Sequence, residues 1–166
     1  IAVVLVVLII AAVMAVGSGL LGTSIAMLGD MTDSISLYLN RAGAGWPANT
    51  GIRTPTQVEP LAGGFVEMDN EDVAVYSAYG AKIRTIQPGY ARPALAVGNT
   101  RFVLYNRAGK ELTVQTRTRQ LYAKSFNNAI MLCEMAQNGT LAVVTESDRY
   151  AAEVMVYDAS FSGDPF

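Results

Sequence analysis

A strand pattern that returns about every forty residues constrains the fold of this chain more than any other feature of its sequence. One series of β-rich runs, each entering a polar turn, recurs with steps of 37 and 39 residues. Its members are 64–69, 101–106 and 140–145. A second series recurs with steps of 39 and 42 residues, and its members are 72–76, 111–115 and 153–157. Two independent series with a common period indicate a structural repeat.

Each repeat has room for four short strands. In the middle repeat the expected strands are Pro93–Val97, Arg101–Tyr105, Glu111–Arg117 and Gln120–Ser125. The turns between them contain Gly98-Asn99 and Ala108-Gly109-Lys110, which suit tight hairpins. Four strands in about 40 residues are typical of a β-propeller blade. A helical repeat would show a period of 3.6 residues, and the strands of a β-sandwich would not return at a fixed interval.

We therefore predict an all-β fold, a partial β-propeller of about two and a half four-stranded blades over residues 63–166. A propeller closes with roughly 4 to 8 blades. We accordingly expect the given chain to be the N-terminal part of a longer protein.

The first 29 residues contain no charged side chain, and 2–16 is an unbroken apolar run. A bilayer core needs about 20 helical residues, so 1–29 predicts one transmembrane helix, a signal anchor that attaches the chain to the lipid bilayer. A cleaved signal peptide is the alternative, because small residues near Ala15 have peptidase spacing. The apolar stretch runs on to Leu28 and favours the anchor. Small residues every four positions offer a surface for helix pairing and a homodimer, at Ala11, Ala15, Gly19 and Thr23.

Residues 30–62 are expected to connect the membrane to the repeats, first as a short amphipathic helix and then as an extended linker. Three Gly and three Pro between residues 43 and 62 indicate the linker. The only tryptophan, Trp46, lies there. It suits either an interfacial anchor or a contact with the globular part.

The composition excludes several kinds of chemistry. The chain has no His and one Cys, which rules out a Ser-His-Asp or Cys-His pair, a His-ligated metal and an intramolecular disulfide. Cys133 lies in an apolar run and is expected to be a buried, inert thiol. The cluster 69–72 lacks the spacing of a calcium loop and predicts a polar turn, as does Asn138-Gly139. No catalytic, cofactor-binding or metal-ligating residue is predicted.

Charge is unevenly distributed along the chain. Residues 59–72 carry a net charge of −5, residues 73–133 of +8 and residues 134–166 of −5. The basic block offers a patch for anionic lipid headgroups or cell-wall polyanions, formed by Arg101, Arg107, Lys110, Arg117, Arg119 and Lys124. The alternative is that Arg117 and Arg119 lie on a solvated outer strand. The acidic total argues against nucleic acid as a partner.

Three segments carry a resemblance to a known family. They are Gly89-Tyr90-Ala91-Arg92-Pro93, residues 101–110, and 144–148 continuing through 153–157. The chain resembles an uncharacterised bacterial family of single-pass membrane proteins, a domain of unknown function with a quinoprotein-like or WD-like β-propeller. The resemblance implies an extracytoplasmic propeller in the cell envelope and supplies no site residues.

These features favour a membrane-anchored, non-enzymatic module that binds or scaffolds a protein or cell-wall partner. One alternative is an enzyme, a hydrolase or quinone-dependent dehydrogenase, with its active site in blades beyond residue 166. Another is a sensor with a signalling domain before residue 1.

Overall fold

The computed structural model describes residues 35, 43 and 45–166 of the chain. The predicted membrane helix, its pairing stripe and nearly all of the predicted short helix lie outside the described residues. No helix within the described part is both long enough and apolar enough to cross a membrane.

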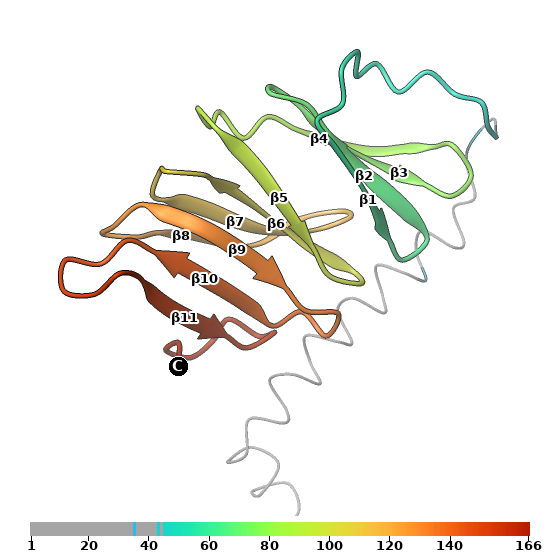
Figure 1. Ribbon diagram of the computed structural model, residues 1–166. Helices are drawn as coiled ribbons and strands as arrows, with labels where there is room; N and C mark the ends of the chain where they lie inside the picture. The colour runs from blue at the N-terminus through green and yellow to red at the C-terminus, as the bar shows by residue number, and fades with distance from the viewer. Residues whose placement is uncertain (1–34, 36–42, 44) are drawn as a thin grey trace, which may run out of the picture.

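The described residues form three antiparallel sheets that follow one another in chain order (Figure 1). The first sheet has the order β1-β2-β3-β4, with strands Gln57–Leu61, Gly64–Met68, Val73–Ser77 and Lys82–Ile86. The second has the order β5-β6-β7-β8, with strands Pro93–Val97, Arg101–Asn106, Glu111–Thr116 and Gln120–Ser125. The third has the order β9-β10-β11, with strands Ile130–Met135, Leu141–Thr145 and Glu153–Tyr157. This confirms the all-β prediction and the repeated four-stranded unit, of which the third sheet has three strands in the described residues.

Both repeat series identified in the sequence correspond to equivalent strands of the three sheets. The first series falls on β2, β6 and β10, and the second on β3, β7 and β11. The four strands of the middle sheet match the prediction to within a residue at each end. The repeat spacing arises because each sheet is built in the same order by hairpins of similar length.

The first sheet begins earlier than predicted. Gln57–Leu61 was assigned to the linker, but it forms β1 and pairs with β2 from Gln57 opposite Met68 to Leu61 opposite Gly64. Pro60 argues against a strand in the sequence pattern, since proline donates no backbone hydrogen bond. It is tolerated here because β1 is an edge strand.

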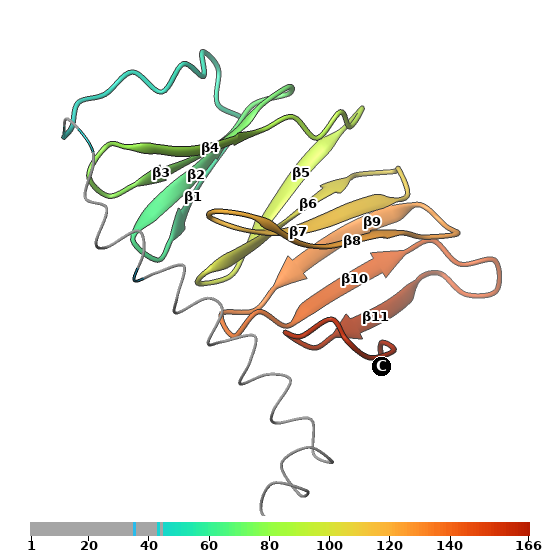
Figure 2. The same ribbon diagram turned by 180° about the vertical axis from the view of Figure 1, so that it is seen from behind.

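The three sheets follow one another side by side (Figure 2). Two apolar cores join them, and the middle sheet contributes to both. Alternation along its strands sends Phe102 and Leu104 toward the first sheet, and Val103 and Tyr105 toward the third. All four side chains are at most 2% exposed. This explains the unbroken apolar run Phe102–Tyr105 in β6, because both faces of that strand are covered.

Hydrogen bonds between strands of different sheets add to this packing. The Gln57 side-chain amide donates to the Leu95 carbonyl at 3.3 Å and accepts from its N–H at 3.1 Å, which joins β1 to β5. The Ile130 N–H donates to the Gly109 carbonyl at 2.6 Å and ties β9 to the middle sheet. The sheets therefore have a fixed relative position.

Trp46 packs on the first sheet, which is one of the two environments expected for it. Its ring centroid lies 5.4 Å from that of Phe65 and 6.1 Å from that of Tyr76. Its Nε1 donates to the carbonyl of Ala78 at 3.0 Å. The segment around Trp46 thus covers part of the outer face of the first sheet.

Candidate functional site

The sheets have two distinct ends, because every connection between consecutive sheets lies at the same end. We call this the crossover end. Its connections are residues 69–72, 87–92, 107–110, 126–129 and 146–152. The opposite end, which we call the hairpin end, contains hairpin turns within a sheet and none of the connections between the three sheets. These turns are residues 62–63, 78–81, 98–100, 117–119 and 136–140.

This topology divides the predicted basic patch. Arg107, Lys110 and Lys124 lie at the crossover end, whereas Arg101, Arg117 and Arg119 lie at the hairpin end. Opposite ends of a strand about six residues long are separated by roughly 20 Å. The six residues therefore do not form one surface.

Two members of the predicted patch are buried, which corrects both interpretations of the patch. Arg101 is 3% exposed and Arg117 is 4% exposed. Arg117 donates to the carbonyl of Ala62 in the first sheet, and Arg101 donates to the carbonyl of Ala159 after β11. These guanidinium groups bridge the middle sheet to its neighbours on either side. Neither faces an external partner, and Arg117 does not lie on a solvated strand.

A glycine turn makes room for Arg117. Gly63, in the turn between β1 and β2, has a φ of +76°, and a Cβ built there would lie 2.9 Å from Arg117 Nη1. Only glycine both adopts this backbone conformation freely and leaves space for the guanidinium. The buried arginine and the turn it contacts are therefore one structural unit.

At the crossover end, two clefts open between adjacent sheets. The first cleft lies between the first and middle sheets and has a volume of about 570 Å³. Its polar lining includes Asn70, Arg92 and Arg107, and both arginines are exposed. This cleft presents positive charge without a carboxylate in its lining.

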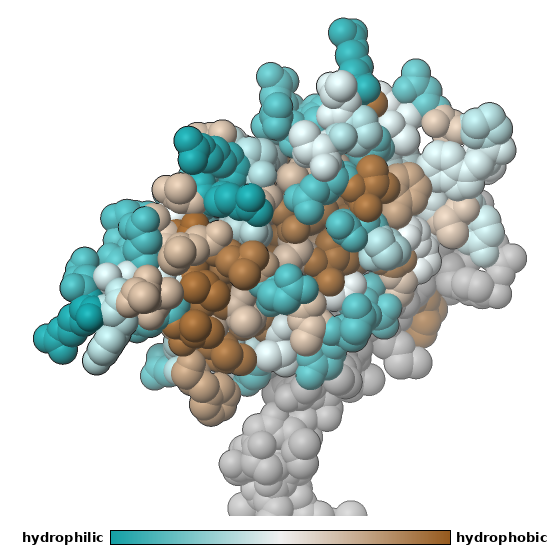
Figure 3. Space-filling view, in the orientation of Figure 1, coloured by the Kyte–Doolittle hydropathy of each residue, from teal (hydrophilic) through white to brown (hydrophobic). Residues whose placement is uncertain are grey.

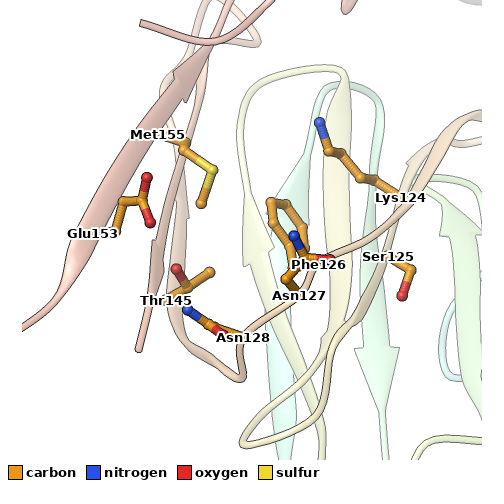
Figure 4. A pocket seen from close by; sticks show the side chains of 8 residues that line it. All are labelled: Lys124, Ser125, Phe126, Asn127, Asn128, Thr145, Glu153 and Met155. Atoms are coloured by element: carbon orange, nitrogen blue, oxygen red, sulfur yellow. The ribbon is translucent and has the colours of Figure 1, made fainter. Parts of the chain in front are cut away.

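The second cleft lies between the middle and third sheets and has a volume of about 290 Å³. Figure 4 shows Lys124 and Phe126 on one side, Glu153 and Met155 on the other, and Thr145 and Asn128 below them. The cleft thus carries opposite charges on walls that belong to different sheets. Asn127 and Ser125 complete its lining.

Lys124 has a defined position in this cleft. Its Nζ lies 4.9 Å from the ring centroid of Tyr157 and 5.6 Å from that of Phe126. A hydrogen bond with the Tyr157 side chain is the main cause that raises the pKa of Lys124. The ammonium group therefore stays protonated and is held over aromatic rings.

The other titratable groups singled out from the sequence behave as expected. Burial raises the pKa of the Cys133 thiol to about 12, and its side chain is 1% exposed. Asp69 accepts hydrogen bonds from the N–H groups of Glu71 and Asp72, so 69–72 is the predicted polar turn. The Asn138-Gly139 turn is also confirmed, with a φ of +87° at Gly139.

Within the described ranges, no three acidic, Cys or His side chains are grouped as metal ligands.

Sequence reasoning found only part of the second cleft. It singled out Lys124 as a basic residue but not Asn127, Asn128, Glu153 or Met155. The adjacent asparagines between two strand runs were a usable signal, since they mark the connection from one sheet to the next. The position of Glu153 opposite Lys124 depends on the packing of sheets and has no local signal.

Three solved structures align with part of this chain and share little sequence with it. BBS1N, solved in complex with ARL6DN, aligns with a TM-score of 0.48 and 16% identity over 63% of this chain and 34% of that one. A portion of HIRA gives a TM-score of 0.49 and 12% identity over 66% and 38%. An exported protein of Bacteroides fragilis gives 0.45 and 19% over 67% and 36%. The chain therefore spans a little over a third of the length of each of these proteins.

No curated protein matches the chain. A family match does exist and covers residues 47–162, which includes all three sheets. This agrees with the resemblance noted in the sequence as far as a domain of unknown function is concerned. The chain belongs to the family of unknown function DUF5711.

Proposed function

We propose that this chain is a membrane-anchored, extracytoplasmic and non-enzymatic binding module of the bacterial cell envelope, and that its partners dock at the crossover end. The observation that carries the proposal is the pair of clefts that open at this one end, at 570 and 290 Å³. Rigid strands hold the charged side chains around them. Such a fixed, concave and polar surface suits recognition of a protein or cell-wall partner.

The anchoring part of the proposal rests on residues 1–29, whose uncharged apolar sequence suits insertion into the lipid bilayer as a single pass. Pairing of two such helices along the stripe of small residues would give a homodimer. Three cations of the predicted patch lie at the crossover end and offer contacts to anionic headgroups or wall polymers. They are Arg107, Lys110 and the partly exposed Lys124.

We also propose that the three sheets are blades of a closed β-propeller. In the first series of the repeat, Met68 and Tyr105 are each 2% exposed and pack on the following sheet. Val144 is the equivalent residue of the third sheet, and it lies opposite Leu132 and Val154, which are 48% and 58% exposed. Figure 3 shows apolar side chains gathered over this sheet. A further sheet of the same kind would bury that face as the first two faces are buried.

Cysteine labelling in intact bacterial cells tests the location. Gln137 is exposed in the β9–β10 turn. The Cys133 thiol is buried and has a pKa of about 12, so it should not react with the label in the folded chain. We expect a membrane-impermeant maleimide to label Gln137→Cys in intact cells and the unsubstituted chain only after denaturation. Labelling of Gln137→Cys only after lysis would overturn the extracytoplasmic assignment.

Photo-crosslinking tests the docking end. A benzoylphenylalanine placed at Asn127 reports on the crossover end, and one at Gln137 reports on the hairpin end, since both side chains are exposed. We expect a specific adduct from Asn127 and none from Gln137. Equal yields from both positions would contradict docking at one end.

A further inference from the structure

The charges in the second cleft oppose each other across two sheets without forming a pair. Lys124 projects from β8 of the middle sheet and Glu153 from β11 of the third. Figure 4 shows them on facing sides of the cleft with Phe126 between them. No ion pair joins these two side chains, both of which belong to the described part of the structure. Each is thus open to a group of opposite charge brought by a ligand.

The position of the Lys124 ammonium group is fixed before a ligand binds. The Tyr157 and Phe126 rings hold the Lys124 ammonium at 4.9 and 5.6 Å from their centroids. A carboxylate that approaches Lys124 therefore meets a charge whose position costs little entropy to fix.

The base of the cleft adds polar groups of suitable kinds. The Asn128 side chain lines the cleft and is held in place by donation from its Nδ2 to the Glu146 carbonyl at 3.1 Å. Asn127 is exposed and supplies both a donor and an acceptor. Between the charged walls, Phe126 and the half-buried Met155 offer an apolar surface for methylene groups.

Size and charge together define the ligand class. A volume of about 290 Å³ accommodates a molecule of amino-acid size. We propose that the second cleft binds a short zwitterion, with its carboxylate on Lys124 and its ammonium group on Glu153. This inference extends the proposed binding role of the crossover end by naming the chemistry of one ligand there.

The first cleft provides an internal comparison. Its charged lining consists of Arg92 and Arg107, which have the same sign, so it offers nothing to an ammonium group. Met68 lines the first cleft and Met155 the second. Methyl NMR of methionine-labelled chain therefore observes both clefts in one spectrum.

The experiment titrates the full chain, in neutral maltoside micelles, with linear ω-amino acids of two to six carbons. Matched alkylamines and alkanoates lack one of the two charges. We expect one length of ω-amino acid to shift the Met155 methyl signal in a saturable way and to leave Met68 unchanged. The amine and the carboxylate of the same length should bind at least about tenfold more weakly, because each loses one charge-assisted contact.

Two substitutions assign the contacts. Lys124→Met and Glu153→Gln should each weaken binding of the best zwitterion by about tenfold or more. Arg119→Met at the hairpin end, and Glu146→Gln at the same end but outside the lining, should not. Glu153 is exposed, so its substitution leaves the fold intact. A Met155 signal that does not respond, or responds equally to amine and zwitterion, would overturn the inference.

The outcome separates this inference from the proposed function. If Met155 does not respond but Asn127 still crosslinks a partner, the binding role stands and the zwitterion site is wrong. If Met155 responds while Gln137→Cys is labelled only after lysis, the site stands and the location is wrong.

Discussion

Arginine and lysine residues from one basic block of sequence occupy opposite ends of the middle sheet, and the burial of their side chains differs between the two ends. At the hairpin end, Arg101 and Arg117 are buried and donate to carbonyls of the neighbouring sheets. At the crossover end, Arg107 lines the first cleft, and both Arg107 and Lys110 are exposed. A block of like charge can therefore contain both buried structural cations and exposed cations, and topology decides which is which.

The reason lies in the connections at each end. Hairpin turns are short and bring backbone carbonyls of adjacent sheets close together, so a long cationic side chain can satisfy them. The Ala62 N–H, for example, donates to the Asn99 carbonyl of the next sheet at 2.8 Å. Connections at the crossover end are longer, and they leave space between the sheets.

The largest expected difference between the ends concerns the buried arginines. Arg117→Met should lower the free energy of unfolding by about 2 kcal/mol, because it removes a charged donor from the partly buried Ala62 carbonyl. Arg101→Met should have a similar effect through Ala159. Urea unfolding of the full chain in micelles, followed by the fluorescence of Trp46, measures this loss.

Arg119 is the matched control, since it lies two residues from Arg117 in the same turn and is exposed. Arg119→Met should change stability by less than about 0.5 kcal/mol, and so should Lys110→Met at the other end. Equal losses for Arg117 and Arg119 would show that burial does not distinguish them.

Sequence patterns predicted the middle sheet because its residues and turns agree locally. Apolar runs such as Phe102–Tyr105 and the glycine-containing turns define its four strands. The burial of Arg117 depends instead on Ala62, which is 55 residues away. The second cleft depends likewise on Lys124 and Glu153 coming from different sheets. Local patterns do not encode these distances, so the strands could be predicted and the roles of the cations could not.

A smaller effect is expected from the glycine beside Arg117. Gly63→Ala should lower the free energy of unfolding by about 1 kcal/mol, because alanine is strained in a left-handed backbone conformation. It should lower it further by displacing the Arg117 guanidinium, whose Nη1 would lie 2.9 Å from the new Cβ. Gly89 at the crossover end also has a positive φ, +66°, but a Cβ there meets nothing within 4 Å. Gly89→Ala should therefore show only the backbone cost.

A double-mutant cycle isolates the contact at Gly63. In an Arg117→Met background, the cost of Gly63→Ala should fall toward that of Gly89→Ala, because the flexible Met side chain can move aside. An unchanged cost would mean that backbone strain alone accounts for the effect, and that Gly63 and Arg117 are independent.

The smallest effect is expected from the polar turn at the crossover end. The backbone N–H of Asp72, and then that of Glu71, lowers the pKa of Asp69 from 3.8, so folding favours its charged form. This stability is fully present above pH 3.8 and is lost as the pH falls through the lower pKa of the folded state. Because the side chain is largely solvated, Asp69→Asn should cost only a few tenths of a kcal/mol at neutral pH.

Stability measured between pH 5 and pH 2 should accordingly fall less steeply for Asp69→Asn than for the unsubstituted chain. Asp148→Asn, in the β10–β11 connection of the same end, is the control for the removal of one negative charge. If Asp69→Asn cost as much as Arg117→Met, polar groups at both ends would be equally structural. A small cost would mean that residues at the crossover end can change with little effect on folding, as the proposed binding role of that end requires.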